Sequence, residues 1–146
     1  MSGPDDALVL ALEIPGPFPR CLSPNARCGW RERARETKLA RETGLLAALG
    51  ALSGKPPGPP GPGLRLAMRW TVHRAAGEPM RDLDNLIGGP LKVYQDGIFD
   101  ALGIGSDRQV VEIAVRQVRT QGWSRACCEL RDLGCDGEGT QEGRHP

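Results

Sequence analysis

One segment of this chain, residues 64–72, alternates strictly between apolar and mostly polar side chains, and no other feature limits the choice of fold as strongly. Successive side chains of a β-strand point to opposite faces, so a period of two residues indicates a strand with one buried face. The apolar set is Leu64, Leu66, Met68, Trp70 and Val72, and the intervening set is Arg65, Ala67, Arg69 and Thr71. The fold must therefore contain a β-sheet with one face covered by a second layer.

Similar patterns divide the rest of the chain into strands and helices. The predicted strands are 8–14, 64–72, 111–116 and 126–131. The predicted helices are 30–52 and a second one that ends at Leu102 and begins either in the segment 82–86 or at Pro90. Gly44 lies within the first helical segment and leaves open whether it forms one helix or two. The order β-α-β-α-β-β predicts a mixed α/β fold, in which a small mixed β-sheet is packed with two main helices on one or both faces.

Length and composition indicate one globular domain. The chain has 146 residues, of which 39% are apolar and 25% are charged, as in globular proteins and unlike disordered ones. We expect a single domain over residues 1–133, with a Pro/Gly-rich connector at 53–63 inside it, and a polar, flexible tail at 134–146. No apolar window is long enough to span a membrane, and no basic segment of a secretory signal is found. We therefore expect a cytoplasmic protein without a membrane partner.

The cysteines match no common metal or disulfide pattern. They are Cys21, Cys28, Cys127, Cys128 and Cys135, an odd number without a CxxC pair. Because no secretory signal is found, we interpret them as reduced thiols. A zinc site could combine Cys127 or Cys128 with Cys135 and His145, but this spacing fits no common zinc template.

Two aspartates follow the alternating segment after a short loop. Asp82 and Asp84 are two residues apart, and in an extended backbone their side chains would point the same way. Adjacent carboxylates repel each other unless a cation neutralises them, and Mg²⁺ or Mn²⁺ is the usual cation of an all-oxygen site. The alternative is that one of them caps the following helix, with Asn85 in support.

Other aspartates have ordinary structural explanations. Asp107 stands in a Gly-Ser turn, where Asp is common. Asp96 and Asp100 are four residues apart on a predicted helix, and Lys92 precedes Asp96 by four residues. This spacing is typical of solvent-facing charges or of a surface ion-pair ladder.

The net charge of +1 conceals a basic segment at residues 20–42. This segment holds seven basic and three acidic residues. Six of the seven are arginines, whose planar guanidinium group matches the geometry of a phosphate. The segment therefore predicts a contact surface for the backbone of a nucleic acid, and the alternative is a merely solvated helix face.

Three separated motifs occur in the order found in a known family. They are Arg81-Asp82-Leu83-Asp84-Asn85-Leu86, Phe99-Asp100-Ala101-Leu102-Gly103 and Asp107-Arg108-Gln109-Val110. In these motifs the chain resembles the RusA-type Holliday-junction resolvases, small endonucleases common in prophages. The likeness covers roughly residues 79–119, and the basic segment matches more loosely.

The resemblance implies a homodimer that binds a divalent metal ion and DNA. The implied metal ligands are Asp82, Asp84 and Asp107, with Asp100 as a further acidic position. The three ligands and Lys92 would be the catalytic residues, although Lys92 stands about one helical turn later than the family lysine. Together with the basic segment, the expected DNA contacts are Arg81, Asn85, Arg27, Arg31, Arg33, Arg35 and Lys38.

The expected activity is Mg²⁺-dependent resolution of four-way DNA junctions by paired symmetric nicks, in recombination and repair. Mn²⁺ would substitute for Mg²⁺, no nucleotide cofactor is expected, and the protein would be bacterial or phage-encoded. Three alternatives stay open. They are a nuclease of the same fold for flaps or other branched DNA, a junction-binding protein without catalysis, and an interaction protein whose aspartates are only caps and turns.

Overall fold

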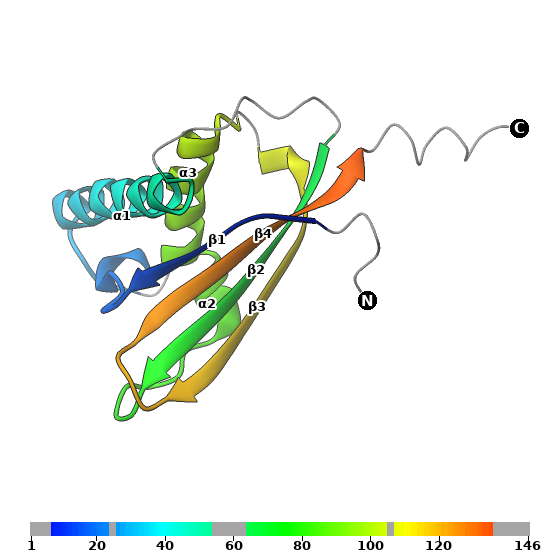
Figure 1. Ribbon diagram of the computed structural model, residues 1–146. Helices are drawn as coiled ribbons and strands as arrows, with labels where there is room; N and C mark the ends of the chain where they lie inside the picture. The colour runs from blue at the N-terminus through cyan, green and yellow to red at the C-terminus, as the bar shows by residue number, and fades with distance from the viewer. Residues whose placement is uncertain (1–6, 24–25, 54–63, 105–106, 136–146) are drawn as a thin grey trace, which may run out of the picture.

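The computed structural model describes residues 7–23, 26–53, 64–104 and 107–135, which form a sheet and a layer of helices (Figure 1). The elements are β1 (Ala7–Pro15), η1 (Arg20–Leu22), α1 (Trp30–Ala51), β2 (Leu64–Ala75), α2 (Leu83–Ile87), α3 (Pro90–Leu102), η2 (Asp107–Gln109), β3 (Val110–Thr120) and β4 (Arg125–Cys135). The four predicted strands and the two predicted helices are confirmed. The first helix is continuous through Gly44.

The four strands form one mixed sheet in the order β1-β4-β2-β3. β2 and β3 are parallel, whereas β4 is antiparallel to both β1 and β2. A parallel pair needs a crossover connection, which α2 and α3 supply between β2 and β3. The predicted mixed α/β fold is therefore confirmed.

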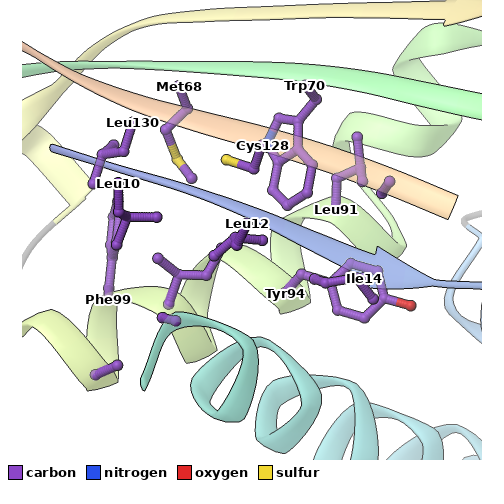
Figure 2. Close-up of a cluster of buried hydrophobic side chains, with 14 of the residues drawn as sticks. Leu10, Leu12, Ile14, Met68, Trp70, Leu91, Tyr94, Phe99, Cys128 and Leu130 are labelled. Carbon is purple, nitrogen blue, oxygen red and sulfur yellow. The ribbon is translucent and has the colours of Figure 1, made fainter. Parts of the chain in front are cut away.

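The hydrophobic core lies between the sheet and the helices (Figure 2). The sheet contributes Leu10, Leu12, Ile14, Met68, Trp70, Cys128 and Leu130, and α3 contributes Leu91, Tyr94 and Phe99. The rings of Trp70 and Tyr94 lie 6.5 Å apart between centroids, which ties β2 directly to α3. Burial of each large apolar side chain contributes roughly 1.5–3 kcal/mol, so this layer fixes how α3 sits on the sheet.

Two glycines allow α1 and α3 to pack backbone against backbone. A Cβ atom on Gly44 would lie 2.3 Å from the carbonyl oxygen of Tyr94, and one on Gly97 would lie 1.9 Å from that of Arg41. Both distances are shorter than any real contact of a Cβ atom. Gly44 weakens the helix locally, as the sequence predicts, but it also permits this close crossing.

Several sequence predictions fall at the edges of the described residues. The connector lies outside them from residue 54 to 63, and so does the tail from residue 136 onward. β4 runs to Cys135, so the segment predicted as a tail begins inside a strand. Within the described part of the chain, no helix combines the length and the apolar character needed to cross a membrane.

The interpretation of all five cysteines as reduced thiols is wrong for Cys21 and Cys28. Their sulfur atoms are bonded, and their Cα atoms lie 5.7 Å apart. The reason is that η1 folds back against the start of α1, where the backbone N–H of Cys21 also donates to Oε1 of Glu36 over 2.8 Å. Cys127 and Cys128 are free thiols. The zinc alternative involves His145, which lies outside the described residues.

Candidate active site

Asp82 and Asp84 stand at the start of α2, and both are exposed. Asp82 occupies the N-cap position with an extended backbone (φ −64°, ψ 139°), and Asp84 lies in the first turn. The capping alternative predicts this position, but the Asp82 carboxylate makes no capping hydrogen bond. Among the residues that the structure describes, neither carboxylate accepts a hydrogen bond or forms an ion pair. Both carboxylates are thus open to solvent at the start of α2.

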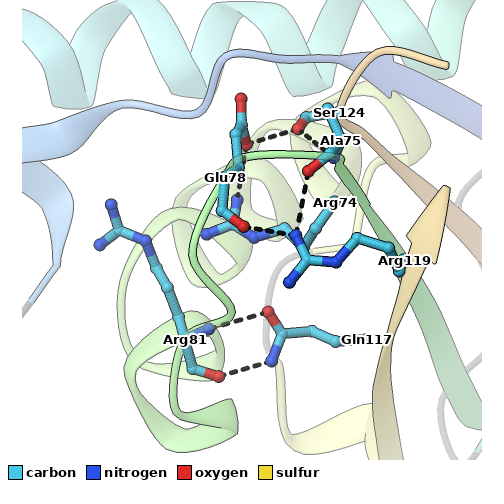
Figure 3. Close-up of polar contacts among 7 residues, drawn as sticks. All are labelled: Arg74, Ala75, Glu78, Arg81, Gln117, Arg119 and Ser124. Atoms are coloured by element: carbon cyan, nitrogen blue, oxygen red, sulfur yellow. Dashed lines mark hydrogen bonds and ion pairs between the residues drawn. The ribbon is translucent and has the colours of Figure 1, made fainter. Parts of the chain in front are cut away.

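The strand β3 fixes the position of the residue before this pair. The side chain of Gln117 holds Arg81 through two hydrogen bonds, accepting from its backbone N–H over 3.1 Å and donating to its carbonyl oxygen (Figure 3). The side chain of Arg81 points away from Gln117 (Figure 3). A fixed backbone with an unengaged guanidinium group is suited to hold an anion next to the carboxylates.

The loop between β2 and α2 is held from two sides (Figure 3). Nη1 of Arg119 donates to the carbonyl oxygen of Ala75 over 3.0 Å and to that of Glu78. Directly before β4, the hydroxyl of Ser124 accepts from the N–H of Ala75 over 3.0 Å and donates to the Glu78 carboxylate. Because the loop is tied to two strands, the acidic pair is preorganised at the end of a rigid sheet.

Asp107, the third predicted ligand, begins η2 directly before β3, and its side chain lies outside the described residues. Arg81 is bonded to Gln117, seven residues beyond the first residue of β3. At a rise of about 3.3 Å per residue, this separation is about 23 Å along the strand. The backbone of Asp107 therefore lies at one end of β3, and the contact to Arg81 lies towards the other (Figure 1). Its role as a ligand stays a prediction.

Asp100 and Lys92, which both lie on α3, interact with other side chains. The two oxygens of the Asp100 carboxylate accept hydrogen bonds from Arg41 of α1, and this holds the pKa of Asp100 below its ordinary value. Lys92 donates to Asp96 over 2.8 Å, the ion pair that the four-residue spacing predicts. Their proposed parts in metal binding and catalysis stay predictions.

The predicted DNA contacts of the basic segment lie at the start of α1 and directly before it. Arg27, Arg31, Arg35 and Lys38 are exposed. The guanidinium group of Arg31 lies over the ring of Trp30, 5.1 Å from its centroid, and Trp30 is 74% exposed. Arg33 instead donates to the carbonyl oxygen of Ala26 over 3.0 Å. The sequence did not mark Trp30 as part of this surface, and an exposed ring between arginines is suited to stack on a base.

The basic start of α1 is connected to the acidic pair through η1. The disulfide Cys21–Cys28 joins η1 to the segment before α1. On its other side, η1 packs against the turn between α2 and α3, because a Cβ atom on Gly89 would lie 2.6 Å from the carbonyl oxygen of Leu22. η1 thus contacts both the segment before α1 and the turn that follows α2.

Among the described residues, one group of three potential metal ligands has its donor atoms within 4.8 Å of one another, and it consists of Cys21, Cys28 and Glu32, not of the acidic pair. The two cysteines are bonded to each other, so their sulfur atoms are not thiolate ligands. This group therefore does not replace the acidic pair as a candidate metal site.

The residues that position the site are absent from the sequence predictions. Gln117 and Arg119 lie on the inward face of β3, whose earlier residues on that face are apolar. In the same way, Arg74 follows the apolar Val72 on the inward face of β2. The sequence signal for these residues is a polar side chain at a position where the two-residue period of the strand predicts a buried apolar one. Comparison of the chain with protein-family models and with curated proteins finds no match.

Proposed function

We propose that this protein is a Mg²⁺-dependent, structure-specific endonuclease that resolves four-way DNA junctions by paired symmetric nicks. The observation that carries the proposal is the pair Asp82 and Asp84, whose exposed carboxylates have no partner among the described residues and stand on a loop held by two strands. Two carboxylates on a backbone fixed by neighbouring strands are suited to share a divalent cation. The resemblance in sequence supplies the substrate class.

The donor set fits a hard divalent cation. Mg²⁺ prefers carboxylate oxygens and is usually bound by one or two carboxylates while keeping several waters, and Mn²⁺ accepts the same ligands. Asp82 and Asp84 would hold the ion. The bound ion would supply an activated water and stabilise the leaving oxygen of the phosphodiester. Arg81 and Asn85, directly beside the pair, would orient the scissile phosphate, and Lys92 is the proposed catalytic lysine.

DNA affinity would come from the basic surface at the start of α1. Exposed arginines and lysines neutralise backbone phosphates and release counterions, so the affinity would be independent of sequence and sensitive to salt. The exposed residues that would contribute this electrostatic affinity are Arg27, Arg31, Arg35 and Lys38. Their charge would also offset the acidic pair, which alone would repel a polyanion.

Symmetric cleavage requires two active sites, which a homodimer would provide. A two-fold dimer matches the two-fold symmetry of a four-way junction. The edge strand β3 exposes two apolar side chains, Val111 at 54% and Ile113 at 43%, and such an edge is suited to pair with a second copy. Light scattering coupled to size-exclusion chromatography would give twice the chain mass. We place the protein in the cytoplasm of a bacterium, encoded by the cell or by a phage.

The first experiment is cleavage of a mobile four-way junction beside a linear duplex of the same sequence, with Mg²⁺ and with EDTA. We expect symmetric nicks in the junction alone, abolished by EDTA. Asp82→Asn and Asp84→Asn should each reduce cleavage by about a hundredfold or more, because a metal ligand contributes several kcal/mol to the transition state. Glu42→Gln, which removes one exposed charge of α1, is the matched control and should cleave normally.

Each alternative function gives a different outcome. Preferred cleavage of flaps would identify a general branched-DNA nuclease, and tight junction binding without cleavage would identify a non-catalytic binding protein. Absence of both metal binding and salt-dependent DNA affinity would leave an interaction protein. Asp107→Asn tests the third ligand by itself. Unchanged cleavage in that variant would remove Asp107 from the site and leave the Asp82–Asp84 pair in place.

A further inference from the structure

Arg74 is a buried cation that lies one residue before the end of β2, on the inward face of the sheet. Its side chain is only 4% exposed, and its guanidinium group lies over the ring of Phe18, 5.4 Å from the centroid. Nη1 is 3.7 Å from a carboxylate oxygen of Glu78, whereas Nε has no hydrogen-bond partner within the described part of the chain. A buried charged group with an unsatisfied donor is costly, and such a donor calls for an explanation. The Arg74 side chain also lines a cavity.

A cavity of about 150 Å³ opens beside this side chain. Its polar lining includes Ser23, Arg74, Arg81 and Asn85, and its other walls are mainly prolines with Phe18 and Leu86. Since a water molecule takes about 30 Å³ of liquid, the space suits a small group of several heavy atoms. Apolar walls keep bulk water out and strengthen charge-assisted hydrogen bonds inside.

The charge around the cavity is positive. Arg74 and Arg81 line it, and Glu78 is the one carboxylate among the described residues that do so. Glu78 is already engaged, accepting a hydrogen bond from Ser124. Burial, with help from the nearby charges of Arg81 and Arg119, lowers the pKa of Arg74 from its ordinary value. An arginine nevertheless keeps its proton in a protein, so the crowded cations favour an anion.

We propose that this cavity is a phosphate-binding pocket, with Arg74 at its base and Arg81 and Asn85 beside it. The guanidinium group of Arg74 would form charge-assisted hydrogen bonds to phosphate oxygens. Because Arg81 and Asn85 directly flank Asp82 and Asp84 in the chain, the pocket would hold one phosphate of a DNA strand beside the acidic pair. The identity of the ligand as DNA rests on the proposed function, whereas the pocket itself does not.

The direct test follows the Nε–H signal of Arg74 in ¹H–¹⁵N spectra of the wild-type protein in EDTA, assigned by its loss in Arg74→Lys. The probes are inorganic phosphate and a short single-stranded DNA oligonucleotide without terminal phosphate. We expect the signal to shift and saturate with the oligonucleotide, and not with sodium chloride. Saturation with inorganic phosphate alone would assign the pocket to free phosphate. An unmoved Arg74 signal in the fully bound oligonucleotide complex would overturn the DNA proposal, and no shift with either probe would overturn the pocket.

Variants give a second, independent readout. Arg74→Gln should weaken oligonucleotide binding at least about tenfold, the usual size of one charge-assisted contact. The slope of log affinity against log salt should also fall by about 0.7, the value for one phosphate of a single strand. Arg74→Lys keeps the charge and should retain most of the slope. Arg116→Gln, an exposed arginine that faces Thr71 on the other side of the sheet, is the control and should change neither.

The two proposals fail separately in this design, because binding is measured without metal. If the oligonucleotide moves the Arg74 signal but no junction is cut with Mg²⁺, the pocket stands and the nuclease function fails. If junctions are cut while the Arg74 signal and the salt slope do not respond, the nuclease function stands and the pocket is overturned. Circular dichroism of Arg74→Gln and Arg74→Lys shows whether each variant is folded. If either is not, the response of the Arg74 signal in the wild-type ¹H–¹⁵N spectra decides whether the pocket binds the probe.

Discussion

Arg41 of α1 and Asp100 of α3 form a two-point ion pair across the helix layer. Nε of Arg41 donates to Oδ2 of Asp100 over 2.7 Å, and Nη2 donates to Oδ1 over 2.9 Å. One guanidinium group thus engages both carboxylate oxygens, beside the place where Gly97 brings the helices together. We therefore expect Asp100 to fasten the two helices, in place of the metal-ligand role that the resemblance implies.

Asp100→Asn should lower stability modestly and leave Mg²⁺ binding unchanged. Arg41 holds the pKa of Asp100 in the folded protein below its ordinary value. The ion pair therefore stabilises the fold fully when the pH is above the ordinary pKa of an aspartate. The stabilisation is lost as the pH falls through the lower pKa of the folded protein. Urea unfolding of wild type and variant should differ most at neutral pH, and the difference should shrink below about pH 4. The effect is small because both side chains are about half exposed. Weakened Mg²⁺ binding at unchanged stability would restore the role as a ligand.

The elements of this fold were predictable because their patterns are local. The alternation from Leu64 to Val72 marks β2, and Pro90 marks the first residue of α3. The order of strands was not predictable, because pairing joins residues far apart, such as Leu12 with Cys128. The end of β3 was not predictable for the same reason. Its last residues are polar, and it is their pairing with β2, up to Ala75, that extends the strand to Thr120.

The residues proposed for the site were named from the sequence, whereas the contacts that hold them in place were not. The spacing of Asp82 and Asp84 left metal binding and helix capping both open, and the metal-ligand role, which the resemblance implies, stays a prediction. Gln117 holds the segment through a contact 36 residues away in sequence, and no local pattern reports such a contact. The bond between Cys21 and Cys28 was missed for the same reason, because only the folding of η1 brings them together.

Reduction of the Cys21–Cys28 disulfide should destabilise the protein by about 2–3 kcal/mol, the value expected from the entropy of closing so short a loop. The two residues are seven apart in sequence. Urea unfolding with and without a phosphine reductant measures the change. Cys28→Ser should be as stable as the reduced wild type and should no longer respond to the reductant. Identical midpoints for oxidised and reduced wild type would show that the bond does not stabilise the fold.

Tyr94 should ionise far later than a free tyrosine. Burial raises its pKa to about 12. It is the one tyrosine of the chain, so phenolate absorbance during an alkaline titration reports this residue alone. Because the unfolded chain ionises near pH 10, stability should be complete below that pH and should be lost as the pH rises towards 12. Titration in urea is the control and should return the ordinary value. Phenolate formation near pH 10 in the folded protein would contradict the buried position.

Gly97→Ala and Gly50→Ala should shift stability in opposite directions. A Cβ atom on Gly97 would lie 1.9 Å from the carbonyl oxygen of Arg41, so α1 and α3 would have to separate. We expect a loss of about 1–3 kcal/mol, the usual cost of overpacking. A Cβ atom on Gly50, near the end of α1, would meet nothing within 4 Å. The same substitution there should add about 0.5–1 kcal/mol, because alanine loses less conformational entropy in a helix.

Urea unfolding at neutral pH measures both variants against wild type. The pair controls for helix propensity, because each variant gains the same methyl group in a helix and only Gly97 faces a neighbouring backbone. If α1 and α3 pack as closely as described, the two free energies of unfolding should differ by at least about 1.5 kcal/mol, the sum of the two smaller expected changes. Equal stabilisation by both substitutions would mean that the helices stand further apart, and the Arg41–Asp100 ion pair would then lose its geometric basis as well.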